Sequence, residues 1–463
     1  MAFTDRLHNR GSISTGYDIE NSLKLEDDNS EGLIKNYSGD GDRRTWTYST
    51  WIKRTELSQD YYCLFFAAYT GIQLMSEDYL RVELYDGTTT RYADTNQLFR
   101  DTSAWYHIVV TLDSTDSTAS DRVKIWINGS RVTDFRTSTY ANMAQNDQFG
   151  IGQASDNYQF GYWFAGGAND RRFCGYVAET HYVNGTALEA TDFGEYDSDS
   201  GIWIPKEYTG SHGSKGFYLK FDDSSNLGKD SSSGGIGDFT LNNITSANQA
   251  TDTPTNNFCT WMPLWAFPKV AGIENGGTST NADFNASTWR GAKGSMGVSR
   301  GKWYWENKAS GNDTIHGWQT DNCVPDSGSN SHNVISTIAY YEAGNYIWLK
   351  DSTSGRNDSS VTGTYAGGQV IGFALNLDSS PQTASFYRNG SAIATDVNID
   401  GLADQTLFPM TSHYNQTSQA NFGGYTSMSN AHTNTDENGY GSFVYAPPSG
   451  YYALCTKNLA EFG

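Results

Sequence analysis

The carboxylates are the residues that could carry acid–base chemistry, and their spacing argues against catalysis. A glycosidase needs two carboxyl groups that flank the scissile bond, which on a strand means positions i and i+2 or i+4. The acids Glu189, Asp192 and Glu195 have a different spacing and lie in a glycine-containing loop. This group therefore predicts no catalytic pair.

Other reactive patterns also fail their requirements. The stretch Gly294-Ser295-Met296-Gly297 lacks the spacing of a nucleophile elbow. The 8 histidines are dispersed, with no H-E-x-x-H zinc motif and no phosphate-binding P-loop elsewhere in the sequence. We therefore expect that the protein is not an enzyme.

An aromatic loop offers a different chemistry, which is glycan binding. Asn157, Tyr158, Tyr162 and Trp163 precede a Gly-Gly pair and combine aromatic rings with short polar side chains. Sugars place their C–H faces on exposed rings while polar side chains bond their hydroxyls. These four residues are the predicted ligand-binding residues. In the alternative interpretation, Trp163 and Phe164 pack beneath the loop as core.

An acidic loop offers oxygen ligands. Asp113, Asp116 and Asp121 lie between two apolar runs, and Ca²⁺ is a hard cation that takes several oxygen ligands. The three aspartates are the predicted metal ligands, with Ca²⁺ as the candidate cofactor. The alternative is an ordinary solvated hairpin loop.

A sequence motif that occurs twice places the acidic loop between two predicted strands. Residues Trp105 to Val132 read WYHIVVTLDSTDSTASDRVKIWINGSRV, and Ile371 to Ile393 read IGFALNLDSSPQTASFYRNGSAI. Apolar residues that alternate with period two predict half-buried strands. The Asn-Gly pairs at 128–129 and 389–390 predict tight hairpin turns, because both central residues need positive φ. The repeated motif indicates two antiparallel sandwiches built on related plans.

Further runs predict strands through most of the chain, including residues 45–54, 61–69 and 79–87. We find no stretch with helix-capping signals and expect an all-β protein whose last strand is YYALCTKNL, residues 451–459. The 48 glycines, with abundant Ser, Thr, Asn and Asp, fit many short strands joined by turns.

Charge and cysteine content restrict the partners and the compartment. A formal net charge of −21 repels nucleic acid and anionic membranes. The 5 cysteines are scattered, and Cys63 and Cys174 lie in apolar runs, so we expect buried free thiols and folding in a reducing cytoplasm. Neither an apolar signal segment nor an 18-residue apolar span occurs, so we expect no secretion signal and no membrane insertion.

Several motifs in order carry a resemblance to known families. STWIKR, WYHIVVTLD, KIWINGSRV and FCGYVAETHYVNGTAL resemble a LamG or concanavalin A-like jelly roll. GKWYWE, VIGFALNLD, SFYRNGSAI, LFPM and NFGG resemble a SPRY domain, which is also a concanavalin A-like sandwich. We therefore expect an N-terminal arm at residues 1–21, a LamG-like jelly roll at 22–252 and a SPRY-like sandwich at 253–463. Calcium binding is known in the LamG-like family, so this resemblance supports the prediction of a calcium site at Asp113, Asp116 and Asp121.

The order of these modules is similar to structural proteins of tailed phages, especially marine and cyanobacterial ones. The resemblance implies a virion component made in the host cytoplasm. We expect a homo-oligomeric tail-fibre or appendage adhesin that binds host-surface glycan and attaches to other virion proteins through the arm. Two alternatives remain, a capsid or tail decoration protein and an extracellular glycan hydrolase. In the SPRY-like part, the loop Asp321 to Asn333, with Cys323 and His332, is the expected binding loop.

Overall fold

The chain forms two compact units, residues 14–255 and 256–463, here called the N-terminal unit and the C-terminal unit. The computed structural model describes residues 16–27, 29–57, 61–154, 156–163, 171–263, 272–280, 289–321, 336–351, 355–361 and 363–463. The expected boundary was 252/253, and the change of unit falls at 255/256.

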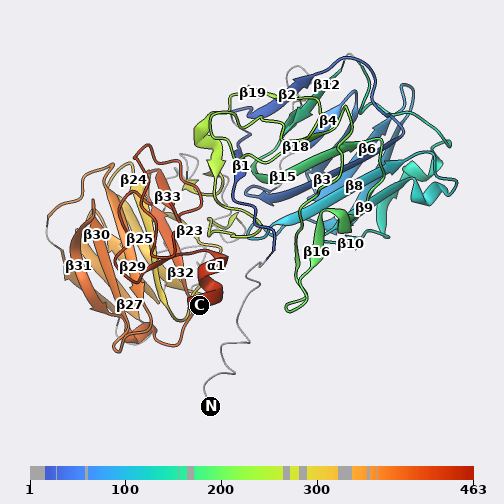
Figure 1. Cartoon of the computed structure of the whole chain (residues 1–463). Coiled ribbons are helices and arrows are strands. Elements are labelled where there is room, and N and C mark those ends of the chain that lie inside the picture. Colours follow the sequence, from blue (N-terminus) through green and yellow to red (C-terminus); the bar gives the residue numbers. More distant parts are fainter. Residues whose placement is uncertain are drawn as a thin grey trace. The chain divides into compact units, whose positions relative to one another are not determined.

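The N-terminal unit is built from two antiparallel sheets that Figure 1 draws in blue to green. In the first sheet the order is β10 (Ser130–Arg131), β9 (Val123–Ile127), β8 (Tyr106–Asp113), β3 (Thr45–Arg54), β15 (Gly175–Asn184), β1 (Ser22–Leu25) and β20 (Gln249–Ala250), with β18 (Phe217–Leu219) also on β15. In the second sheet it is β11 (Phe135–Ser138), β7 (Thr90–Leu98), β6 (Tyr79–Tyr85), β5 (Thr70–Met75), β4 (Tyr61–Ala67), β12 (Asn157–Phe160), β2 (Gly32–Asn36) and β19 (Thr240–Asn242).

The C-terminal unit repeats the two-sheet plan. Its first sheet has the order β21 (Ile273–Glu274), β22 (Ser279–Thr280), β33 (Ser418–Asn421), β24 (Lys302–Ala309), β29 (Val370–Asn376), β30 (Thr383–Arg388) and β31 (Ser391–Asn398), with β34 (Tyr452–Ala453) parallel to β24. Its second sheet has the order β23 (Arg290–Lys293), β32 (Leu407–His413), β25 (Thr314–Thr320), β26 (Thr337–Tyr341), β27 (Tyr346–Asp351) and β28 (Gly355–Ser360).

Both copies of the repeated motif form the predicted hairpins. Asn128 and Gly129 have φ of 48° and 76° between β9 and β10, and Asn389 and Gly390 have φ of 47° and 76° between β30 and β31. Positive φ at both central residues matches the twist of the flanking strands.

Aromatic side chains fill the core of each sandwich. In the N-terminal unit, Tyr48 of the first sheet stacks on Phe65 of the second, with ring centroids 5.2 Å apart and planes 4° from parallel. In the C-terminal unit, Trp305 of the first sheet lies edge-on to Trp318 of the second, with ring centroids 6.4 Å apart. Because one face of each sheet packs on its partner, the expected fold class, all-β with two jelly-roll sandwiches, is confirmed.

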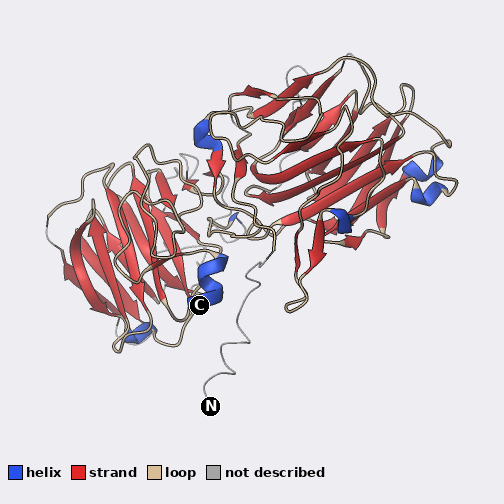
Figure 2. Ribbon diagram, viewed as in Figure 1, coloured by secondary structure: helices blue, strands red, loops and turns tan. Residues whose placement is uncertain are grey.

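The prediction for the end of the chain was wrong. Only Tyr452–Ala453 is strand, and a short helix, α1 (Thr456–Phe462), follows; Figure 2 shows it among the few short helical segments. Leu459 and Phe462 pack against the core of the C-terminal unit, so tertiary contacts stabilise a helix that lacks a capping side chain.

The predicted arm is divided. Residues 1–15 lie outside the described residues, whereas Tyr17 donates a hydrogen bond to Glu179 Oε1 at 2.7 Å and Ile19 is buried, so this part belongs to the N-terminal unit. Cys63, Cys174, Cys259 and Cys455 are buried free thiols as expected, and Cys323 lies outside the described residues. Among the described residues, no helix has the length and apolar character needed to cross a membrane.

Candidate functional site

In the N-terminal unit, the first sheet is covered on the side away from the core. Its outward side chains Trp51, His107 and His181 are buried. Trp203 donates a hydrogen bond to His107 Nδ1 at 3.0 Å, and Phe193 packs on His181 with ring centroids 5.3 Å apart. The outer face of the second sheet is therefore the better candidate for meeting a ligand.

Strand alternation places polar residues on that outer face. In β6, Leu80, Val82 and Leu84 point into the core, which puts Arg81, Glu83 and Tyr85 on the opposite side. In β5 the same rule puts Gln73 beside Glu83, and Gln73 Nε2 donates a hydrogen bond to Glu83 Oε2 at 2.9 Å.

A small hairpin adds an aromatic ring and an arginine to this face. Trp163 of β13 (Tyr162–Trp163) stands opposite Arg171 of β14 (Arg171–Arg172). The Arg171 guanidinium lies 4.4 Å from the Trp163 ring centroid and 4.9 Å from those of Tyr61 and Phe66. The Trp163 ring lies 4.9 Å from Phe66 and 6.2 Å from Tyr69. We call the set Tyr61, Phe66, Tyr69, Gln73, Glu83, Trp163 and Arg171 the aromatic–arginine face.

The charges on this face are fixed by short contacts. Arg171 Nη1 donates to Gln73 Oε1 at 2.6 Å and to Glu83 Oε2 at 3.0 Å. The side chains of Arg171 and Glu83 are about one-sixth exposed, 16% and 15%, so solvent reaches both. The face thus presents a paired cation and anion between aromatic rings.

The most exposed ring stands on a strained turn. Ala68 and Tyr69 connect β4 and β5 with φ of 45° and 61°, values that Asn and Gly adopt more easily. Tyr69 is 62% exposed and lies edge-on to Trp163, with the planes 73° apart. Non-glycine residues held at positive φ concentrate at functional sites.

A glycine makes room for the floor of the face. Gly71 lies directly opposite Phe66 in the β4–β5 ladder. A Cβ at Gly71 would stand 2.0 Å from Phe66 Cδ2, far inside van der Waals contact. The fully buried Phe66 ring therefore lies flat over a residue that has no side chain.

The four residues predicted for glycan binding divide between core and surface. Tyr158 is a correction: its side chain is fully buried in the core, where burial and neighbouring tyrosines raise its pKa well above the usual value. Tyr162 is also buried. Asn157 lies on the outer face of β12, and Trp163 is half-buried within the aromatic–arginine face. Phe164 lies outside the described residues.

Sequence reasoning missed Tyr61, Tyr69, Glu83 and Arg171. The alternation in YLRVELY, residues 79–85, was the available signal for Glu83. No local signal marks Ala68-Tyr69 as a turn.

The three predicted calcium ligands are held by local bonds. Asp113 accepts hydrogen bonds from the backbone N–H and hydroxyl of Thr115, Asp116 accepts from the N–H of Thr118, and Asp121 forms an ion pair with Arg131 at 2.6 Å. They are not among the metal-compatible clusters of the described residues. The arrangement matches the solvated-loop alternative.

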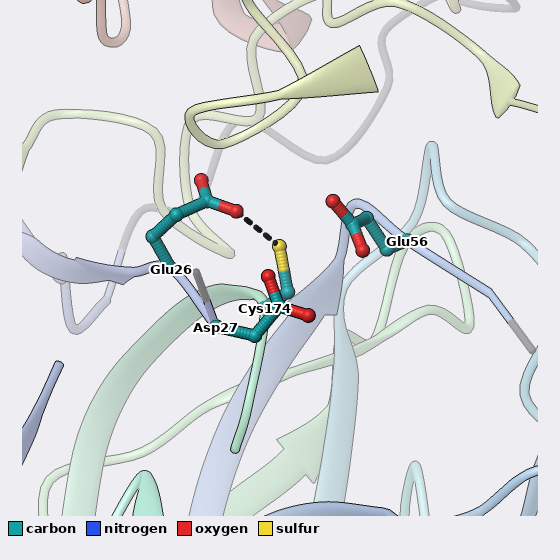
Figure 3. Close-up of side chains that lie close together, drawn as sticks. All are labelled: Glu26, Asp27, Glu56 and Cys174. Carbon is teal, nitrogen blue, oxygen red and sulfur yellow. Dashed lines mark hydrogen bonds between the residues drawn. The ribbon is translucent and has the colours of Figure 1, made fainter. Parts of the chain in front are cut away.

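The described part of the chain does hold one metal-compatible group, shown in Figure 3. Ligand atoms of Glu26, Asp27, Glu56 and Cys174 lie within 4.8 Å of one another. The Cys174 thiol donates to Glu26 Oε1 at 3.1 Å. Burial, then the carboxylates, raises the pKa of Cys174 well above its usual value, which keeps the sulfur protonated. The contact between the Cys174 sulfur and the Glu26 carboxylate is therefore an S–H···O hydrogen bond.

The candidate catalytic patterns have structural roles. The Asp192 carboxylate accepts a hydrogen bond from the Glu189 N–H at 2.9 Å, and Glu195 is exposed on β16 (Gly194–Tyr196). The sequence also contains E-x-D-x-x-E at residues 26–31, where Glu26 accepts a hydrogen bond from the Cys174 thiol at 3.1 Å and Glu31 pairs with Lys24 at 3.2 Å. A G-x-S-x-G pattern spans residues 297–301. It connects β23 to β24, with no helix after it, so its geometry differs from a nucleophile elbow.

In the C-terminal unit, a buried glutamate holds the chain that covers the first sheet. Glu306 of β24 accepts hydrogen bonds from the N–H groups of Val444 and Tyr445, both at 2.8 Å, and from Asn421 Nδ2 at 3.0 Å. Burial raises its pKa to about 7.

The predicted binding loop of this unit, with Cys323 and His332, lies largely outside the described residues. A groove of about 480 Å³ lies elsewhere in this unit, and its lining includes Glu274, Lys308 and Gln419.

A family model agrees with the sandwich architecture of the N-terminal unit. Residues 28–192 match the family model of the concanavalin A-like lectin/glucanases superfamily. Similar solved structures include the SPRY domain of human HERC1, at 16% identity over 35% of this chain and 96% of that one, with a TM-score of 0.28. A Bacteroides ovatus protein described as carbohydrate binding has 14% identity over 49% and 59%, with a TM-score of 0.35. The SAP-like pentraxin of Limulus polyphemus has 15% identity over 37% and 80%, with a TM-score of 0.27.

No curated protein sequence matches the chain. The matched segment includes every residue of the aromatic–arginine face.

Proposed function

We propose that this protein is a non-enzymatic adhesin that binds a host-surface glycan through the aromatic–arginine face. The observation that carries the proposal is the presence of exposed rings around paired polar groups on an open sheet face. Tyr61 and Tyr69 are 41% and 62% exposed, and both Arg171 and Glu83 reach solvent. Aromatic surfaces with a few convergent hydrogen-bonding groups are the chemistry that sugars require.

The non-enzymatic part of the proposal is supported by the carboxylates of the same sheet face. Glu83 is paired with Arg171, and Asp94 is paired with Arg81 through two hydrogen bonds of 2.8 Å. Their ion pairs give both carboxylates a binding or structural use. The proposal therefore assigns no catalytic residue.

The particle on which the adhesin acts is proposed from the resemblance to structural proteins of tailed phages. We assign the protein to a phage appendage, attached to other virion proteins through the segment before Gly16. Several copies on one particle would raise weak sugar affinities through multivalency. Mass spectrometry of purified particles of the encoding phage tests this part. Absence of the protein from the particles would refute it.

Glycan binding is tested with the full chain on an array of bacterial polysaccharides, with Tyr69→Ala and a matched control. Tyr196 is the control because it is also exposed, 53%, and lies edge-on to a tryptophan, Trp203. Tyr69→Ala should lose binding, and Tyr196→Ala should keep it. Particle incorporation with no glycan binding would favour the decoration alternative. Hydrolysis of a bound glycan would overturn the non-enzymatic assignment.

A further inference from the structure

We infer that the aromatic–arginine face selects a neutral hexose unit, whose neighbouring hydroxyls bond to Arg171 and Glu83. This inference rests on the proposed glycan-binding function and names the class of sugar. It follows from the hydrogen-bonding capacity that the two side chains still have.

The donor side is the unused edge of the Arg171 guanidinium. Nη1 makes both of its hydrogen bonds within the protein, to Gln73 and Glu83. Among the described residues, Nε and Nη2 of Arg171 have no hydrogen-bond partner, and neither is a buried atom. These two nitrogens form one edge of a rigid planar group, which directs its N–H bonds outward together.

The acceptor side is the second oxygen of Glu83. Oε2 accepts from Gln73 and Arg171. Within the described part of the chain, Oε1 accepts no hydrogen bond and is not buried. Because Arg171 and Glu83 are bonded at 3.0 Å, free donors and a free acceptor stand side by side.

Sugar hydroxyls suit such a pair. Each hydroxyl both donates and accepts. One hydroxyl would accept from Arg171 while its neighbour donates to Glu83. The rings of Tyr61 and Trp163, on which Arg171 lies, provide apolar surface next to these groups for the C–H face of the same sugar.

The charge of Glu83 disfavours the binding of an acidic sugar. Arg171 is a cation that would otherwise attract a uronate carboxylate in a two-bond fork. Its charge is already balanced by Glu83, so an added carboxylate meets no net positive charge and is repelled at short range. The formal net charge of −21 adds to this repulsion.

The test compares sugars that differ only by the acid group. The full chain is titrated calorimetrically with β-1,4-linked oligomers of mannose and mannuronate, glucose and glucuronate, and with α-1,4-linked oligomers of galactose and galacturonate. We expect the neutral member of the recognised pair to bind at least about tenfold more tightly. Equal or tighter binding of the uronate would overturn the inference and leave the glycan-binding function intact. If no oligomer and no arrayed polysaccharide binds, the proposed function itself fails.

A charge-only substitution tests the role of Glu83. Glu83→Gln keeps the shape of the side chain and removes its charge, so the preference for the neutral sugar should shrink several-fold. Glu77→Gln is the control, because Glu77 is an exposed acid paired with Arg136 in the same unit. An unchanged preference in folded Glu83→Gln, or an equal change in Glu77→Gln, would refute the assignment.

Discussion

Replacing Gly71 by alanine should weaken ligand binding without unfolding the protein. The added Cβ would lie 2.0 Å from Cδ2 and 2.4 Å from Cε2 of Phe66. Carbon atoms in contact stand about 3.5–4.0 Å apart, so the ring must move by roughly 1.5 Å. The backbone at Gly71 imposes no further strain, because its φ is not positive.

The displaced ring is the floor on which the ligand-binding groups lie. Phe66 contacts the Trp163 ring at 4.9 Å and the Arg171 guanidinium at 4.9 Å. Overpacking of a core typically costs about 1–3 kcal/mol, a loss that a sandwich of this size should tolerate. If Trp163 and Arg171 shift with the ring, the dissociation constant should rise at least about tenfold, or about 1.4 kcal/mol.

Calorimetric titration with the recognised oligosaccharide and urea denaturation measure the two effects separately. Gly16→Ala is the control, because a Cβ there meets no atom within 4 Å. Wild-type affinity in Gly71→Ala, together with an unchanged midpoint of unfolding, would show that the Phe66 ring does not determine the position of Trp163 and Arg171.

Three other predictions concern charge. Asp252→Ala should lower the free energy of unfolding of the N-terminal unit by about 3–5 kcal/mol, because Lys53 stays buried while the Asp252 carboxylate, now 2.8 Å away, is removed. Adding Lys53→Met should restore most of the lost stability in urea denaturation, and no rescue would refute this account. Glu306 has a pKa raised from 4.5 to about 7, so the folded state holds its proton longer, and stability of the C-terminal unit should fall by about 3 kcal/mol as pH rises through that window; Glu306→Gln should lack this step in denaturation curves measured across pH. EDTA should leave oligosaccharide affinity unchanged, because Asp121 is paired with Arg131; weaker binding in EDTA would restore the calcium hypothesis.

Much of the fold was predictable from local sequence. The strand expected at residues 45–54 is β3, and both Asn-Gly pairs form the expected turns. The strand β7, TRYADTNQL, was missed because its outward residues are polar and its apolar residues are few. Helix α1 was missed because its stability comes from Leu459 and Phe462 packing on a distant core, which no capping residue signals.

The candidate site was less predictable than the fold. Trp163 was identified, but Tyr158, only five positions before it, points into the core. The face gathers residues from β4, the β4–β5 turn, β5, β6 and the β13–β14 hairpin, up to 110 positions apart from Tyr61 to Arg171. Which residues meet depends on strand order across the sheet, and that order is not encoded by any single stretch.

The position of β1 has a consequence for how the N-terminal unit can be handled. β1 pairs with β15 on one side and with β20 on the other, and Ser22 donates a hydrogen bond to the Asp252 carbonyl at 2.6 Å. The two ends of the unit are thus neighbours in one sheet, as in domains that tolerate insertion and circular permutation. During synthesis, one edge of β1 stays unpaired until β20 has been made. We therefore expect residues 16–255 to tolerate insertion into a surface loop of another protein, with the aromatic–arginine face displayed.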